Sequence, residues 1–266
     1  ENGEWEKLLS WDPDDSLSSG PLGFSKDGKF LYLKDSRAVN TGRLIRLEIA
    51  TGESEVIAED PQYDVGDVVI HPDRYEIQMV SFTRARTEWM IIDQSIKRDI
   101  AAIRKLHHGD FHIMSRDNAD LTWLVGFIVD NGPVRFYAFD RKTQKGTFLF
   151  DNKPDLNKYM LAAMEPLSFT SRDGWTIQGY ITFPPGMGKN NLPMVLNVHG
   201  GPWARDIWGY DPEAQWFANR GHACLQVNFR GSTGYGKNFL NAAIKEWGGK
   251  MHDDLVDAVQ WAIKQG

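Results

Sequence analysis

Short apolar runs alternate with polar turns through the first 150 residues, and the pattern repeats. Three polar turns, each carrying an aspartate just before an apolar run, lie at Ser25–Gly28, His71–Arg74 and Ser115–Asn118. They recur about every 45 residues, which is typical of a four-stranded propeller blade. An aspartate suits such a turn because its side chain accepts hydrogen bonds from the backbone two residues further on.

A second marker recurs at a matching interval. Apolar runs end in Glu48, Asp93 and Asp140, and each leads through a turn to a further apolar run. These last runs, each expected to be a strand, are Val56–Ala58, Ile100–Ile103 and Thr147–Phe150. The two markers together predict about three β-propeller blades. An all-β sandwich with evenly spaced turns is the alternative. Because a propeller closes at about four to eight blades, we expect further blades before Glu1.

The pattern changes after a polar linker at Asp151–Leu161. A hairpin with its turn at Arg172–Gly174 comes first. The continuously apolar run Met194–Val198 then indicates a strand buried on both faces, as in a parallel sheet. The elements that follow are a helix at Asp211–Arg220, a second buried strand at His222–Phe229 and a helix at His252–Gln265. This order predicts the opening of a doubly wound α/β sheet, with propeller blades in residues 1–160 and the α/β domain in 161–266.

The sharpest local motif is Asn197–Trp203, which contains His199, Gly200, Gly201 and Pro202. It follows a predicted buried strand, where ligands bind in α/β folds. Adjacent glycines let backbone N–H groups approach a substrate closely. In α/β-hydrolases a loop of this kind supplies a donor to the oxyanion hole. A glycine turn capped by a histidine is the structural alternative.

Four segments together carry a resemblance to a known family. They are Ser171–Gly174, His199–Pro202, Asn228–Gly236 and Trp247–Asp254. Over residues 165–266 the chain resembles the prolyl oligopeptidase family of serine peptidases, especially its dipeptidyl-peptidase and acylaminoacyl-peptidase branches. Over the blades the resemblance is one of architecture, since a propeller followed by a hydrolase domain is the order of this family.

The resemblance implies cleavage of short peptides by a Ser-Asp-His triad under a propeller that limits substrate size. It places the oxyanion hole at the backbone of the first glycine, Gly200, with Gly201 beside it. His199, Pro202 and Trp203, together with Arg230 and Tyr235, are implied as residues of the active-site loops. Some branches have a tyrosine at the position of His199, so the side-chain version of the oxyanion hole is not expected here.

The triad itself is not identifiable in this sequence. A nucleophile elbow needs G-x-S-x-G, and Ser232 has the wrong glycine spacing, which favours a turn residue. We expect both domains to be incomplete here, with the triad after Gly266 and no hydrolysis by this chain alone. No catalytic residue is assigned within it, and His222 and His252 receive no catalytic role.

Arg230 has two interpretations. It follows a buried strand at its carboxyl end, which would bring it near the active centre. Alternatively it pairs with Asp253 or Asp254 of the following helix and fixes the loop, and this structural role is favoured.

Composition narrows the class of protein. Hydrophobic residues make up 41% and charged residues 25%, the balance of a globular protein. The net charge of −6 argues against a nucleic-acid partner. No apolar run of about 18 residues is present, so we expect a soluble protein without a membrane partner. The sequence leaves the compartment open, cytoplasm or periplasm.

Other candidate chemistry is weaker. The lone Cys224 lies in an apolar run, where a buried thiol is favoured over a nucleophile. His107, His108, His112 and Asp110 cluster, but a solvated turn is favoured over a metal site because no ligand framework surrounds them. No phosphate loop or dinucleotide fingerprint is present, so no cofactor or metal is expected.

Three functions are therefore weighed. The first is a serine peptidase with short peptides as its partners. The alternatives are a propeller-bearing binding protein with a vestigial hydrolase half, and an α/β-hydrolase esterase, which carries similar glycine loops. The sequence leaves the oligomeric state open, a homo-oligomer included.

Overall fold

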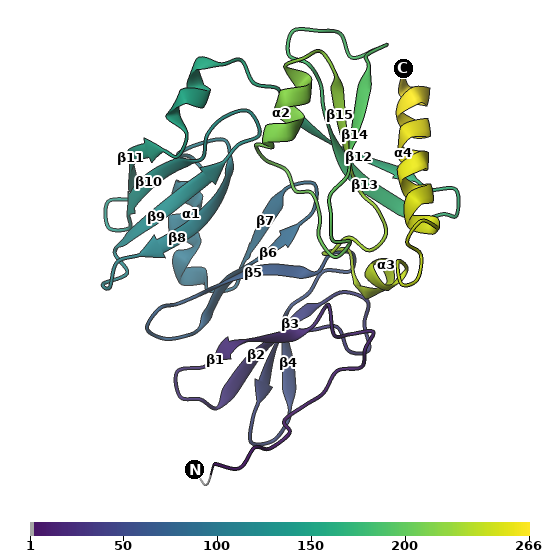
Figure 1. Ribbon diagram of the computed structural model, residues 1–266. Coiled ribbons are helices and arrows are strands. Elements are labelled where there is room, and N and C mark those ends of the chain that lie inside the picture. The colour runs from purple at the N-terminus through teal and green to yellow at the C-terminus, as the bar shows by residue number, and fades with distance from the viewer. Residues whose placement is uncertain (1–2) are drawn as a thin grey trace. The chain divides into compact units, whose positions relative to one another are not determined.

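The computed structural model describes residues 3–266 (Figure 1). They form two compact units. The first contains the chain up to Arg84 with residues 88–94 and 233–242, and the second contains residues 85–87, 95–232 and 243–266.

The first unit opens with an antiparallel four-stranded blade. Its strands, in spatial order, are β1 (Gly20–Phe24), β2 (Phe30–Asp35), β3 (Arg43–Glu48) and β4 (Ser54–Ala58). The turn predicted at Ser25–Gly28 joins β1 to β2. There Asp27 accepts from the hydroxyl of Ser25 and the N–H of Lys29, so the aspartate has the role that the sequence predicts.

The next sheet has three strands, β5 (Val65–Ile70), β6 (Ile77–Thr83) and β7 (Thr87–Ile91). The strand expected at Ile100–Ile103 is wrong, because these residues belong to helix α1 (Lys97–Ile103), preceded by the short 3-10 helix η1 (Gln94–Ile96). Ile96, Ile100 and Ile103 are fully buried. Their spacing of four and three residues puts them on one face of a helix. The apolar run therefore forms the buried face of α1 and not a strand.

The second unit contains another four-stranded antiparallel blade. Its strands are β8 (Asp110–Arg116), β9 (Thr122–Ile128), β10 (Arg135–Asp140) and β11 (Lys145–Asp151). Trp123 is fully buried in it, and the guanidinium groups of Arg116 and Arg141 lie 4.3 and 4.6 Å from the centre of its ring. The 3-10 helix η2 (Pro154–Lys158) follows within the predicted linker.

The α/β part then begins with the hairpin β12 (Met164–Thr170) and β13 (Thr176–Thr182). The spatial order of the sheet is β12-β13-β15-β14. Strands β14 (Met194–Asn197) and β15 (Ala223–Asn228) are parallel and are joined through helix α2 (Pro212–Ala218). Helices α3 (Lys237–Asn241) and α4 (Lys250–Gln265) come last, and α2 and α4 lie on opposite sides of the sheet (Figure 1).

The fold class is thus propeller blades followed by an α/β sheet, as predicted. The compact units divide the chain differently from the predicted domains, because the blade β8–β11 clusters with the α/β sheet. The carboxylate of Asp130 accepts from Met164 N–H, and its carbonyl accepts from the amide of Gln215, which ties the two parts together. The boundary at residue 160 stays a prediction.

Candidate active site

The glycine loop leaves β14 at the carboxyl end of the strand. Gly200 and Gly201 are exposed, and within residues 3–266 their N–H groups donate to no protein acceptor. Gly201 has φ +129°, and a Cβ there would lie 2.7 Å from Trp203 N, so this position requires glycine. A Cβ at Gly200 would meet nothing within 4 Å. The loop therefore presents open backbone donors from a constrained turn.

The ring of His199 is held by Phe229 and Ser232. It stacks on Phe229 with 4.7 Å between ring centroids, and Nε2 lies 2.9 Å from the hydroxyl of Ser232. The Ser232 hydroxyl donates to Phe229 O at 2.6 Å, which leaves its lone pairs to accept from Nε2–H. Nδ1 lies 2.9 Å from Gly200 O. Because a neutral imidazole has one N–H, donation from Nε2 to Ser232 leaves Nδ1 without a proton for Gly200 O. His199 is thus fixed to the segment that follows β15 through Ser232 and Phe229.

Ser232 has a histidine nitrogen within hydrogen-bond reach, which is the arrangement that activates a serine nucleophile. Its side chain is fully buried, however, and its hydroxyl proton is used by Phe229 O. This geometry agrees with a turn residue, the role that the glycine spacing favours.

Arg230 is buried between two carboxylates. Its guanidinium bonds to both oxygens of Asp254, from α4, at 2.6 and 2.8 Å, and to both oxygens of Asp173, from the β12–β13 turn, at 2.8 Å. The Arg230 N–H also donates to Asp254. Hydrogen bonds from Arg230 hold the pKa of Asp173 well below its usual range. The guanidinium therefore connects the loop after β15 with the β12–β13 turn and with α4.

The sequence named Asp254 as a partner of Arg230 and missed Asp173. The second candidate, Asp253, pairs instead with Arg172, whose guanidinium also binds Asp257. The signal for Asp173 was its place in the hairpin turn that carries the family resemblance, but no spacing rule connects that turn to residue 230.

Asp206 and Gln226 are two further polar residues that the sequence did not single out. The N–H of Asp206 donates to the Asn228 side chain at 2.7 Å, and Asn228 returns a bond to Asp206 O at 3.0 Å. Burial raises the pKa of Asp206. The Gln226 amide donates to the Asp206 carboxylate at 3.3 Å. A partly buried acid thus lies only a few residues after the glycine loop.

The remaining predicted loop residues differ in burial. Pro202 is buried, and Trp203 is about half exposed. Tyr235 belongs to the first unit, where its ring packs against Tyr63 and Phe239, with 6.0 and 5.4 Å between centroids.

The other candidate groups have structural partners. Asp110 binds Arg86, and the rings of His107 and His108 pack at a tilt, with 4.2 Å between their centroids. Within residues 3–266 no cluster of three or more His, Cys, Asp or Glu side chains forms a metal site. Cys224 is fully buried, and burial raises the pKa of its thiol to about 12. Over the same residues, no helix is long and apolar enough to span a membrane.

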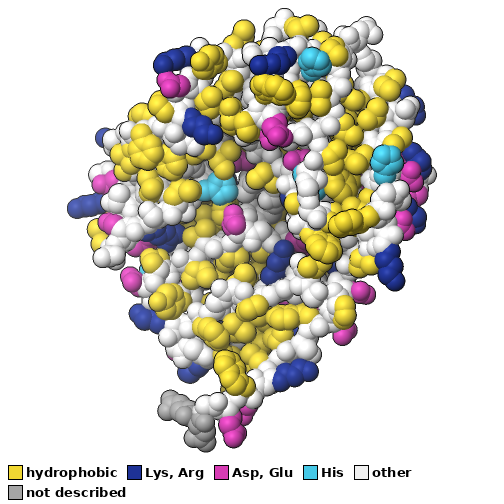
Figure 2. All heavy atoms as spheres, viewed as in Figure 1, with side chains coloured by type: hydrophobic (Ala, Val, Ile, Leu, Met, Phe, Trp, Pro, Cys, Tyr) yellow, Lys and Arg dark blue, Asp and Glu magenta, His cyan; other side chains and the backbone are white. Residues whose placement is uncertain are grey.

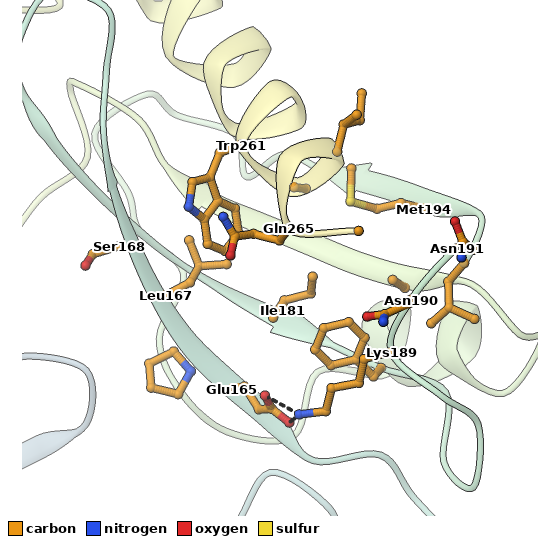
Figure 3. Close-up of a pocket in the computed structure, with 17 residues that line it drawn as sticks. Glu165, Leu167, Ser168, Ile181, Lys189, Asn190, Asn191, Met194, Trp261 and Gln265 are labelled. Atoms are coloured by element: carbon orange, nitrogen blue, oxygen red, sulfur yellow. Dashed lines mark hydrogen bonds and ion pairs between the residues drawn. The ribbon is translucent and has the colours of Figure 1, made fainter.

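A cavity of about 620 Å³ lies between the C-terminal end of α4 and the β12–β13 hairpin (Figure 3). Trp261, Leu167 and Ile181 contribute apolar surface, and at its edge Lys189 Nζ lies 2.6 and 2.8 Å from the oxygens of Glu165. None of its lining residues belongs to the glycine loop. On the molecular face in Figure 2, acidic and basic side chains are interspersed without a field of one sign.

Comparison with known proteins extends this description. The model of the prolyl oligopeptidase family matches residues 208–266. Over the whole chain, identity is 43% to dipeptidyl aminopeptidase BIII of Pseudoxanthomonas mexicana and 30% to dipeptidyl peptidase family member 6 of Caenorhabditis elegans. The chain spans only 40% and 39% of the lengths of these two relatives.

Solved structures agree on the fold. A puromycin-hydrolyzing peptidase of Mycobacterium tuberculosis matches with a TM-score of 0.71 at 16% identity, covering 93% of this chain and 39% of that one. The acylaminoacyl peptidase of Pyrococcus horikoshii matches with a TM-score of 0.64 at 20% identity, covering 100% of this chain and 40% of that one. The matches confirm the resemblance read from the sequence, and the chain belongs to the prolyl oligopeptidase family.

Proposed function

We propose that the protein containing this chain is a serine peptidase that cleaves short peptides through an acyl-enzyme. The observation that carries the proposal is the pair of exposed N–H groups at Gly200 and Gly201, which donate to no acceptor among the residues that the structure describes. Such donors suit a developing negative oxygen because they are fixed before the reaction begins. The relatives of this chain that are named as dipeptidyl peptidases support peptides as the substrate class.

In this mechanism a serine hydroxyl attacks the scissile carbonyl while a histidine takes its proton. The carbonyl oxygen becomes an oxyanion, and the loop N–H groups donate to it. The C–N bond then breaks, the leaving amine takes the proton, and water hydrolyses the acyl-enzyme. We place the triad outside this chain, because the sequence has no nucleophile elbow. Gly200 and Gly201 supply the donors, and His199 and Pro202 support their loop.

The domain assignment belongs to the same proposal. We assign residues 1–160 to the last blades of a propeller and residues 161–266 to the first half of the hydrolase domain. Short peptides are the proposed partners, and the net charge of −6 supports neither nucleic acids nor an anionic membrane surface. The proposed compartment is the cytoplasm or the periplasm.

The test is hydrolysis by the full-length protein of a dipeptidyl anilide, compared with a simple acyl ester. A peptidase cleaves the anilide, and a serine-directed inhibitor abolishes the activity. Cleavage of the ester alone would favour an esterase, and no cleavage of either would favour a binding protein with a vestigial hydrolase half. The purified 266-residue chain serves as the inactive control, and turnover by it that the inhibitor abolishes would contradict placement of the triad elsewhere.

A further inference from the structure

Residues 233–242 follow β15 in the sequence, but they belong to the first compact unit, together with the blade β1–β4. The chain enters that unit directly after Ser232 and leaves it after Ala242. The chemistry proposed for Gly200 and Gly201 does not explain why this segment lies against the blade.

Backbone groups of the 233–242 segment bond to the loop between β2 and β3. The N–H of Lys237 donates to Asn40 O at 2.8 Å, and the N–H of Asn238 donates to the Asn40 side chain at 3.0 Å. Gly236 has φ +84°, and a Cβ there would collide with the side chain of Asn40. The segment therefore approaches the blade as closely as its backbone allows.

Lys237 supplies the charged contact of this segment. Its ammonium donates to Asp15 at 2.6 Å and to Ser36 O at 3.0 Å. Asp15 is buried and also accepts from the Ser36 hydroxyl at 2.8 Å. Burial raises the pKa of Asp15, but the hydrogen bonds from Lys237 and Ser36 outweigh it and hold that pKa below its usual range. The pair is therefore ionised at neutral pH, and hydrogen bonds between charged groups are among the stronger ones.

The residue just before this segment contacts the glycine loop. The Ser232 hydroxyl lies 2.9 Å from His199 Nε2, and His199 is the neighbour of Gly200 in the chain. Arg230 fixes the chain two residues before Ser232, and the 233–242 segment fixes it on the other side. A displacement of that segment would therefore move Ser232 and, through His199, the N–H of Gly200.

We propose that Lys237 is a positioning residue for the oxyanion hole, whose bond to Asp15 fixes Ser232, His199 and the N–H of Gly200. The proposal rests on the peptidase function proposed above. Donors to an oxyanion are effective because they are fixed before the reaction begins. Lys237 acts through the chain and not on the substrate, so its loss should weaken binding of the transition state alone. Such a loss lowers kcat and leaves KM unchanged.

The test measures hydrolysis of a dipeptidyl anilide by the full-length protein carrying Lys237→Met. We expect kcat to fall about three- to tenfold, with KM unchanged. Lys237→Arg keeps a cation for Asp15 and should recover most of the lost kcat. Lys29→Met is the matched control and should change neither constant, because Lys29 is an exposed lysine of the same blade, paired with the exposed Asp27.

A second variant keeps the test decisive should Lys237→Met fail to fold. Asn40→Ala removes the side-chain acceptor of the Asn238 N–H, and it should lower kcat in the same way by a smaller factor. An unchanged kcat in the folded variants, or a raised KM at constant kcat, would overturn the proposal and leave the segment a purely structural connection. A kcat that stays equally low in Lys237→Arg would overturn it too, because the cation would then not matter.

Nuclear magnetic resonance separates this claim from the function. The ring-nitrogen shifts of labelled His199 report its bond to Ser232 without requiring activity, and they should change in Lys237→Met and not in Lys29→Met. If the wild-type protein hydrolyses nothing but these shifts change, the peptidase proposal fails and the positioning role stands. If it hydrolyses the anilide and neither the shifts nor kcat change in Lys237→Met, the positioning role fails alone.

Discussion

Two loops leave neighbouring parallel strands, β14 and β15, at their carboxyl ends, and they differ in almost every physical respect. The loop after β14 exposes Gly200 and Gly201, with N–H groups that donate to no described acceptor. The loop after β15 contains Arg230, which is buried and bound by two carboxylates. Glycines follow both strands, so a glycine-rich turn at a strand end does not by itself identify a site. What distinguishes the first loop is its unused hydrogen-bonding groups.

The two loops also depend on different parts of the chain. The second is held by Asp173 and Asp254, which come from the hairpin and from α4. The first is held mainly by its own residues and by the contact of His199 with Ser232. We infer that the Arg230 cluster, formed by Arg230, Asp173 and Asp254, stabilises the fold, whereas the loop after β14 carries the reactive groups. The following variants test this difference between the two loops.

The largest effect is expected for Arg230→Met. It leaves Asp254, which is fully buried, without its cation, and breaking one side of a buried ion pair costs about 3–5 kcal/mol. The urea unfolding midpoint measures the loss. The matched control is Arg172→Met, whose partners Asp253 and Asp257 are more exposed, so a much smaller shift of the urea midpoint is expected there. Similar losses of stability in the two variants would contradict the assignment of a structural role to Arg230 that Arg172 lacks.

Substitution by alanine should destabilise the protein at Gly201 and leave its stability almost unchanged at Gly200. Gly201→Ala would place a Cβ 2.7 Å from Trp203 N at φ +129°, which costs about 1–3 kcal/mol. Gly200→Ala has open space and should change stability by about 0.5 kcal/mol or less. The melting temperatures of the two variants measure this difference. A lower melting temperature for Gly200→Ala than for Gly201→Ala would contradict the described geometry of the loop.

These contrasts mark what the sequence was able to predict. The strands β14 and β15 and the helix α4 follow from apolar periodicity, because it is local and depends on which face is buried. The same reasoning failed at Ile100–Ile103, where a short apolar run suits a strand or a helix equally and tertiary packing decides. Other features depend on residues far apart in sequence, so no local pattern predicts them. They are the bond between Arg230 and Asp173 and the acceptors of Asp206 and Gln226 that are unpaired within the described residues.

A smaller effect is expected for Ser232→Ala. It removes the hydrogen bonds to His199 and to Phe229 O, at a cost of about 1 kcal/mol. In the full-length protein kcat should fall while KM stays constant, because the ring of His199, the neighbour of Gly200 in the loop, is then held less firmly. Complete loss of activity with covalent-inhibitor labelling abolished would instead identify Ser232 as the nucleophile.

The smallest effect is expected for the decline of stability at acidic pH when Asp173 is replaced. The Arg230 hydrogen bonds lower the pKa of Asp173 in the folded protein. Its stabilising contribution is therefore present above the pKa of the unfolded chain, near 4, and is lost as pH falls toward the folded value. Melting temperatures between neutral and acidic pH should show a shallower acid-induced decline for Asp173→Asn than for the wild type. Parallel declines would mean that this carboxylate does not contribute.

The most direct test of the central claim is the structure of the full-length protein with a peptide boronate bound to its nucleophilic serine. The boronate mimics the tetrahedral intermediate, so its oxygen marks the position of the oxyanion. We predict that this oxygen lies about 2.7–3.1 Å from the backbone nitrogen of Gly200 or Gly201, with Arg230 still bound to Asp173 and Asp254. An oxygen held entirely by other groups, with the glycine loop facing solvent, would contradict the account.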